Sequence, residues 1–95
     1  MIHIMARITV KPDSAAAARD ILATLVNETR KEAGCLGYEL FQRADAPHVF
    51  QTVEQWTDKA AADAHMATPH VGAAIGAAGP MFSAPPEILA FSKLM

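Results

Sequence analysis

The chain has 95 residues, of which 52% are hydrophobic and 19% are charged, and its formal net charge is −2. A chain of this length forms one domain, which we take as residues 1–95. The eight Lys and Arg residues are scattered along the sequence, which excludes the basic surface needed for nucleic-acid binding. No segment resembles a membrane span or a signal peptide, so the sequence predicts a soluble, cytoplasmic protein that does not bind a membrane.

The first predicted elements are a strand and a long helix. Residues 2–10 alternate between apolar and mixed positions, which is the period of a β-strand. Residues 14–33 then have helical periodicity, with Asp13 or Ser14 as the cap and Gly34 as the stop signal. The apolar stripe of this helix consists of Ile21, Leu22, Leu25 and Val26.

A hairpin and a broken helix follow. The β-rich runs 36–43 and 48–56 flank the turn-forming segment ADAP, which predicts an antiparallel pair of strands. Asp58 can cap a short helix that continues to about Ala67.

The next helix has a second capping signal, because Thr68 and Pro69 suit its N-cap and first position. The final segment, PPEILAFSKLM, predicts a closing strand after two prolines.

The resulting order is β-α-β-β-α-β, which is typical of a ferredoxin-like α+β sandwich with a four-stranded antiparallel sheet and helices on one face. The other sheet face has no helix to cover it. Four aromatic residues on the strands exceed the number that one covered face requires: Tyr38, Phe41, Phe50 and Trp56. We therefore expect this face to pack on the identical face of a second chain, forming a homodimer.

Glu54 is the first candidate for chemistry. Period-two spacing places it on the same face of its strand as Phe50, Thr52 and Trp56. In a partly desolvated site its carboxyl group would be a base for an acidic phenol or hydroquinone. The alternative is a structural role in which Glu54 pairs with Arg7 or Arg43 across the sheet.

His65 is the second candidate, because its helix must fold back over the end of the strand that carries Trp56. It is either a residue of the same cavity or a partly buried histidine bonded to a backbone carbonyl. His70, near the start of the next helix, is either a neutral proton relay or an ordinary surface residue.

The two histidines are predicted not to form a metal site. An i, i+5 spacing turns about 140° around a helix, and Pro69 interrupts the helix between them. Nucleotide cofactors and acyl transfer are also disfavoured, because the chain has no GxGxxG, P-loop or nucleophile-elbow motif. We expect no cofactor.

Two tracts, EAGCLGYEL and VFQTVEQWTDKAAADAHMATPHV, resemble the antibiotic biosynthesis monooxygenase domain, a group that includes small quinol monooxygenases. The resemblance covers nearly the whole chain. Its most specific part is E-x-W-x-D followed by His65, Thr68, Pro69 and His70, and the motif G-C-x-x-Y supports it.

The resemblance implies a dimeric α+β barrel and oxygenation without flavin, metal or haem. In that chemistry the deprotonated substrate itself reduces dioxygen, and the protein supplies a base, a dry pocket and orientation. The expected partners are a small aromatic or quinol-like substrate and dioxygen. The expected catalytic residues are His65, Glu54 and His70, and the expected substrate-binding residues are Trp56, Tyr38, Phe50, Met66 and Phe82.

Relatives of this family also process a phosphorylated signal sugar or degrade haem, so the fold does not fix the reaction. The haem-degrading members resemble one another in an Asn on the first strand, where this chain reads HIMAR at residues 3–7. We predict a cofactor-free quinol monooxygenase. The alternatives are an isomerase-like enzyme acting on a small carbonyl or signal-sugar substrate, and a non-catalytic dimer that binds a small ligand.

Overall fold

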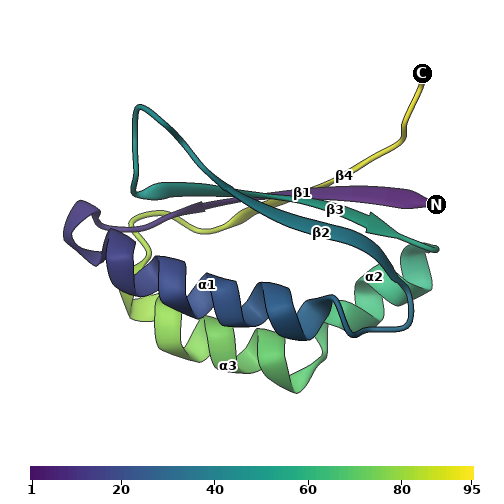
Figure 1. Ribbon diagram of the computed structural model, residues 1–95, viewed down its shortest axis with the longest axis horizontal. Helices are drawn as coiled ribbons and strands as arrows, with labels where there is room; N and C mark the ends of the chain where they lie inside the picture. Colours follow the sequence, from purple (N-terminus) through teal and green to yellow (C-terminus); the bar gives the residue numbers. More distant parts are fainter.

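Four strands form one sheet in the computed structural model, which describes all 95 residues (Figure 1). The strands are β1 (Ile2–Thr9), β2 (Cys35–Gln42), β3 (Val49–Trp56) and β4 (Glu87–Phe91). Their order in the sheet is β2-β3-β1-β4, and every neighbouring pair is antiparallel. This topology confirms the ferredoxin-like α+β fold expected from the sequence.

Three helices cover one face of the sheet: α1 (Ala15–Thr29), α2 (Lys59–Met66) and α3 (Pro69–Ala78) (Figure 1). Helices α1 and α3 pack against each other, while α2 contacts β1 and β3. Short 3₁₀ turns at Pro12–Ser14 and Gly79–Met81 connect the helices to the sheet. None of the helices has the length and hydrophobicity to cross a membrane.

Side-chain caps fix the starts of α2 and α3, and the second of them lies at the sharp change of direction between the two helices. Asp58 accepts a hydrogen bond from the backbone N–H of Ala61 at 2.8 Å, which caps α2 as predicted. Thr68 is the N-cap of α3, and its hydroxyl also donates to the backbone oxygen of His65 at 2.7 Å. This turn brings the last residues of α2 close to the first residues of α3.

The predicted end of the first helix is wrong. Helix α1 ends at Thr29, and the chain continues through a tight turn in which the amide of Glu32 bonds to the carbonyl of Thr29. Gly34 is not a left-handed stop residue, because its φ angle is negative. It permits close approach instead, since a Cβ atom at this position would overlap the side chain of Ala61 in α2. Ser14 occupies the N-cap position of α1, but its side chain makes no capping hydrogen bond.

The hydrophobic core lies between the sheet and the helices. The larger of two clusters packs β1 and β3 against α1 and α3: Ile8, Val10, Ala18, Leu22, Leu25, Phe50, Val71 and Ala74. The smaller cluster joins Val26, Tyr38 and Trp56 near α2. Trp56 and Phe50 are each only 1% exposed, and burial of a large side chain contributes about 1.5–3 kcal/mol to stability.

The aromatic residues do not distribute over the sheet as predicted. Tyr38, Phe50 and Trp56 all point into the helix-covered core, and only Phe41 faces the open side. The argument from excess aromatic residues is therefore wrong. The open face nevertheless carries Leu89 and Phe91 of β4, which are 48% and 42% exposed. Dimerisation through this face stays a prediction.

Candidate active site

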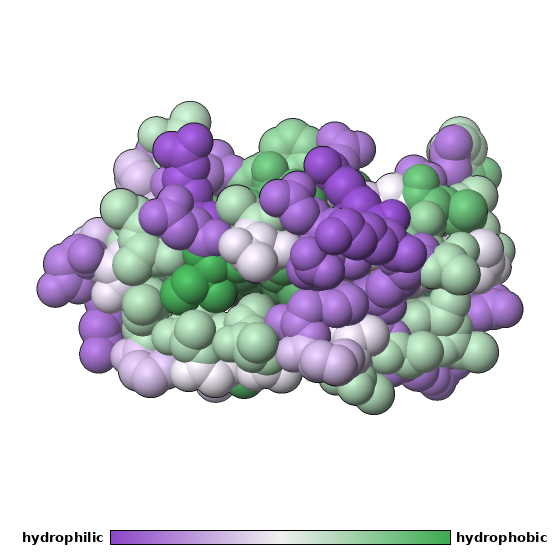
Figure 2. All heavy atoms as spheres, turned by 60° about the horizontal axis from the view of Figure 1, so that its bottom comes forward, coloured by the Kyte–Doolittle hydropathy of each residue, from purple (hydrophilic) through white to green (hydrophobic).

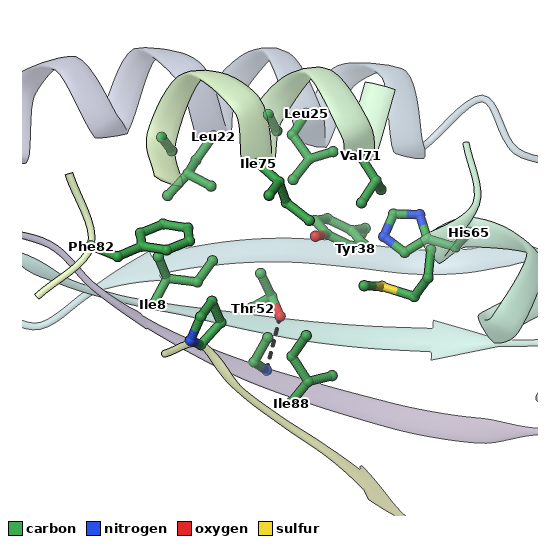
Figure 3. Close-up of a pocket in the computed structure, with 15 residues that line it drawn as sticks. Ile8, Leu22, Leu25, Tyr38, Thr52, His65, Val71, Ile75, Phe82 and Ile88 are labelled. Atoms are coloured by element: carbon green, nitrogen blue, oxygen red, sulfur yellow. Dashed lines mark hydrogen bonds between the residues drawn. The ribbon is translucent and has the colours of Figure 1, made fainter. Parts of the chain in front are cut away.

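A small apolar cavity lies between the sheet and helices α1 and α3 (Figure 3). Its volume is about 80 Å³, and 12 of its 15 lining residues are hydrophobic. Met66, Ile75 and Ile88 line it and are about half exposed, so the cavity reaches the surface there. Figure 2 shows the helical side of the molecule, where strongly hydrophobic side chains are recessed within a paler surface. An apolar cavity with few polar groups suits a small aromatic ligand.

Three of the five predicted substrate-binding residues line this cavity, namely Tyr38, Met66 and Phe82. The other two do not. Phe50 lies in the core beneath α1, and the Trp56 ring stacks behind His65 with ring centroids 4.8 Å apart. These two residues support the wall of the site from behind.

His65 is almost completely buried at the end of α2 and contributes its ring to the cavity wall. Its Nδ1 atom lies 2.7 Å from Oε2 of Glu32. An ionised carboxyl group only accepts hydrogen bonds, so a neutral ring bonded to it donates from Nδ1 and has its lone pair on Nε2. In Figure 3 one ring nitrogen of His65 points into the cavity beside Tyr38. The predicted alternative of a bond to a backbone carbonyl is wrong, because the partner is a side-chain carboxyl group.

His70 meets the same carboxyl oxygen. Its Nε2 atom lies 2.8 Å from Oε2 of Glu32, and the rings of His65 and His70 are 6.0 Å apart. The argument from spacing, by which the two rings would lie on different faces, is therefore wrong. The angle around a single helix does not apply here, because the chain turns at Thr68 and α3 runs in another direction from α2. The interruption at Pro69, which counted against a shared site, accompanies the turn that brings the two rings together.

Glu32 is the residue that sequence reasoning missed. It lies in the turn after α1, and its side chain is 16% exposed. The tract EAGCLGYEL begins with Glu32, but the family resemblance of that tract rests on Gly34, Cys35 and Tyr38. The available signal was the position of Glu32, an acidic residue two positions before Gly34, which permits the close approach of α2.

The side chain of Glu54 is bonded to neighbouring side chains of its own strand and not directed at the cavity. Its Oε2 accepts a hydrogen bond from the Thr52 hydroxyl at 2.7 Å, and its Oε1 accepts one from the Trp56 indole at 2.9 Å. Thr52 in turn accepts from the backbone N–H of Ala6 at 3.0 Å (Figure 3). The residue is 4% exposed and does not line the cavity.

The predicted ion pair of Glu54 is also wrong. Arg7 pairs with Glu87 on the open sheet face, and Arg43 pairs with Asp45 in the hairpin turn. Both arginine side chains are more than half exposed, whereas Glu54 points into the core. Period-two alternation separates Glu54 from these partners.

Tyr38 supplies the other polar group of the cavity. Its hydroxyl points toward the cavity interior, and no protein group forms a hydrogen bond with it (Figure 3). Burial raises the pKa of Tyr38 far above its usual value, and the nearby charge of Glu54 adds to that effect. The phenol therefore stays neutral and is available as a hydrogen-bond donor to a ligand.

Comparison with known proteins fixes the family. The sequence profile of the antibiotic biosynthesis monooxygenase family matches residues 1–77. The chain belongs to this family. It is 30% identical to YcnE of Bacillus subtilis over 89 residues, which cover 94% of each protein. It is also 32% identical to Rv0793 of Mycobacterium tuberculosis over 69 residues, which cover 73% of this chain and 67% of that protein. Both relatives carry monooxygenase as a proposed activity in their names.

The fold agrees with this assignment. A crystal structure of an antibiotic biosynthesis monooxygenase superposes with a TM-score of 0.95 over the full length of both chains, at 27% sequence identity. Family membership supports an oxidoreductase that uses a small molecule and dioxygen. Family membership alone does not identify the substrate or the catalytic residues.

Proposed function

We propose that this protein is a cofactor-independent monooxygenase that oxidises a small phenol or hydroquinone with dioxygen. One observation carries the proposal. The buried imidazole of His65 is held by Glu32 on one side and opens on the other side onto an apolar cavity, into which the hydroxyl of Tyr38 also projects.

The proposed reaction begins with proton transfer. The substrate hydroxyl gives its proton to Nε2 of His65, while Glu32 stabilises the imidazolium that forms. Tyr38 donates a hydrogen bond to a substrate oxygen. The substrate anion is then electron-rich enough to reduce dioxygen in an apolar, water-poor site.

The electrons balance without a cofactor. A hydroquinone and one O₂ give a hydroxyquinone and one water, so one oxygen atom enters the ring and the other leaves as water. All four electrons that reduce O₂ come from the substrate. The protein therefore needs only a base, a hydrogen-bond donor and a cavity, which His65, Tyr38 and the apolar lining provide.

The cavity lining favours a quinol over a phosphorylated sugar. Its polar side chains are Tyr38, Thr52 and His65, and no Lys or Arg lines it. A phosphate group would lack a cationic partner there. A cavity of about 80 Å³ is smaller than the roughly 150 Å³ that holds a benzene ring, so binding of a single aromatic ring requires movement of Met66 and Ile75 at the mouth.

We further propose that the active species is a homodimer formed through the open face of the sheet. Half-exposed Leu89 and Phe91 on the edge strand β4, and Phe41 on the opposite edge strand β2, would be buried there. In this arrangement the dimer supports β4, whose residue Ile88 lines the cavity.

Oxygen uptake with a panel of hydroquinones, polyphenols and naphthols tests the reaction class. Stoichiometric O₂ consumption with formation of a hydroxylated quinone supports the monooxygenase. Conversion of a substrate without O₂ consumption indicates an isomerase-like enzyme instead, and saturable binding without turnover indicates a ligand-binding dimer.

A further inference from the structure

Glu32, His65 and His70 bring together three side chains that can bind a metal ion. Their ligand atoms all lie within 4.8 Å of one another, although they come from the turn after α1, the end of α2 and the start of α3. The hydrogen bonds from the two rings to a single carboxyl oxygen hold the three groups in this arrangement.

Two imidazoles and one carboxylate are a ligand set for Zn²⁺ and related cations, which accept three protein ligands plus water. Zinc–ligand distances of about 2.0–2.2 Å place tetrahedral ligand atoms about 3.3 Å apart. Small side-chain rotations therefore convert the hydrogen-bonded cluster into a coordination site. The side chains of Glu32 and His70 are 16% and 21% exposed, which gives an ion and its water ligand access.

The electrostatic surroundings also favour a cation. No Lys or Arg forms a salt bridge with Glu32: the four such bridges are made to other acids, and the nearby Arg30 donates to the backbone oxygen of Tyr38. Glu54 is a second acidic group near the same end of the cavity, and both acids act in the same direction on the pKa of Tyr38, raising it in addition to the larger effect of burial. A divalent ion would neutralise this local negative potential.

We propose that Glu32, His65 and His70 form a site for a Zn²⁺-type divalent cation, and that occupation of this site inhibits the enzyme. The inhibitory part rests on the proposed role of His65 as the base. A metal bound to Nδ1 of a neutral imidazole leaves the ring proton on Nε2, and an Nε2–H group cannot accept a proton from the substrate. Glu32 would also be diverted from the imidazolium to the metal.

The position of the site distinguishes it from a catalytic metal centre. Nδ1 of His65 faces Glu32, whereas the cavity lies on the side of the other ring nitrogen. Neither Glu32 nor His70 lines the cavity. An ion held by the three groups would lie behind His65, where it blocks proton transfer without touching the substrate.

Binding is measured first, without reference to activity. Tag-free, EDTA-treated protein is titrated with ZnCl₂ by calorimetry, and with CoCl₂ while the visible absorption of bound Co²⁺ is recorded. We expect one ion per chain, and a loss of affinity of about 10–100-fold in Glu32→Gln and in His70→Gln. His48→Gln is the matched control and should bind like the parent, because His48 lies in the hairpin, away from the cluster. MgCl₂ should not bind, since Mg²⁺ prefers oxygen ligands.

Absence of saturable Zn²⁺ binding up to about 1 mM would overturn the site. Equal loss of affinity in His48→Gln would overturn it as well, because binding would then be non-specific. Circular dichroism of each variant establishes that it is folded.

Inhibition is measured second. Oxygen uptake should fall over the same Zn²⁺ concentrations that fill the site, EDTA should restore it, and His70→Gln should shift the inhibition to higher concentrations. Stimulation by Zn²⁺, or identical inhibition of His70→Gln, would overturn the inhibitory role. If no quinol is oxidised at all, the proposed function fails while the binding data still decide whether the metal site exists.

Discussion

Glu32 and His65, which are 33 residues apart in the sequence, are joined by a 2.7 Å hydrogen bond between Oε2 and Nδ1. This bond fixes the orientation of the ring, and in the proposed reaction Glu32 is therefore a positioning residue. In Glu32→Gln the amide can still accept the Nδ1–H bond but cannot stabilise the imidazolium. We predict a fall in kcat of about 10-fold or more with little change in KM, measured by oxygen uptake. A raised KM with unchanged kcat would instead show that Glu32 affects only the binding of the substrate.

Glu54 should behave in the opposite way. Its carboxyl group accepts two buried hydrogen bonds and does not reach the cavity. Glu54→Gln leaves at least one of these donors poorly paired, which should cost about 1–3 kcal/mol of unfolding free energy. Turnover per folded molecule should change by less than about threefold. Urea denaturation and oxygen uptake measure the two quantities, and unchanged stability with lost turnover would restore Glu54 as the base.

The packing of α2 on the turn after α1 depends on Gly34. A methyl group there would overlap Ala61, so Gly34→Ala should lower the unfolding free energy by about 1–3 kcal/mol. Gly76→Ala is the matched control, because the added methyl group meets nothing in the exposed middle of α3. It should raise stability by about 0.5–1 kcal/mol. Equal effects of the two substitutions in urea denaturation would contradict the close-approach role of Gly34.

Dimerisation is tested on the open sheet face. Phe91→Lys should shift the protein toward the monomer in sedimentation velocity at micromolar concentration, because a charge would be buried in the proposed interface. Ala60→Lys on the exposed surface of α2 is the control and should leave the dimer intact. If the parent protein is a monomer at this concentration, the predicted dimeric barrel is wrong.

The parts of the fold that sequence predicted well are those encoded locally. Alternating apolar residues mark β1 and β3, and the caps at Asp58 and Thr68 fix the starts of α2 and α3. The end of α1 at Thr29 was missed because no glycine or proline occurs between residues 30 and 33 to signal it.

The site was predicted less completely, because its key contacts are long-range. Glu32 meets partners 33 and 38 residues away, which no local pattern reveals. The i, i+5 spacing of His65 and His70 and the break at Pro69 both argued against a shared site, whereas the turn at Thr68 brings the two rings together. Alternation along β3 predicts correctly the sheet face on which Glu54 lies. It does not predict the hydrogen-bond partners of Glu54, because Thr52 and Trp56 lie on the same strand and not across the sheet.

The central claim is that His65 is the base of a metal-free oxygenation. The most direct measurement is O₂ consumption by EDTA-treated parent protein and His65→Gln on the same hydroquinone, with the thermal stability of both proteins recorded. Glutamine keeps a hydrogen bond to Glu32 but cannot take up the substrate proton, so we predict full turnover in the metal-free parent, a loss of about 10²-fold or more in the variant, and similar melting temperatures. Retained turnover in His65→Gln, or loss of turnover in the parent after metal removal, would contradict the claim.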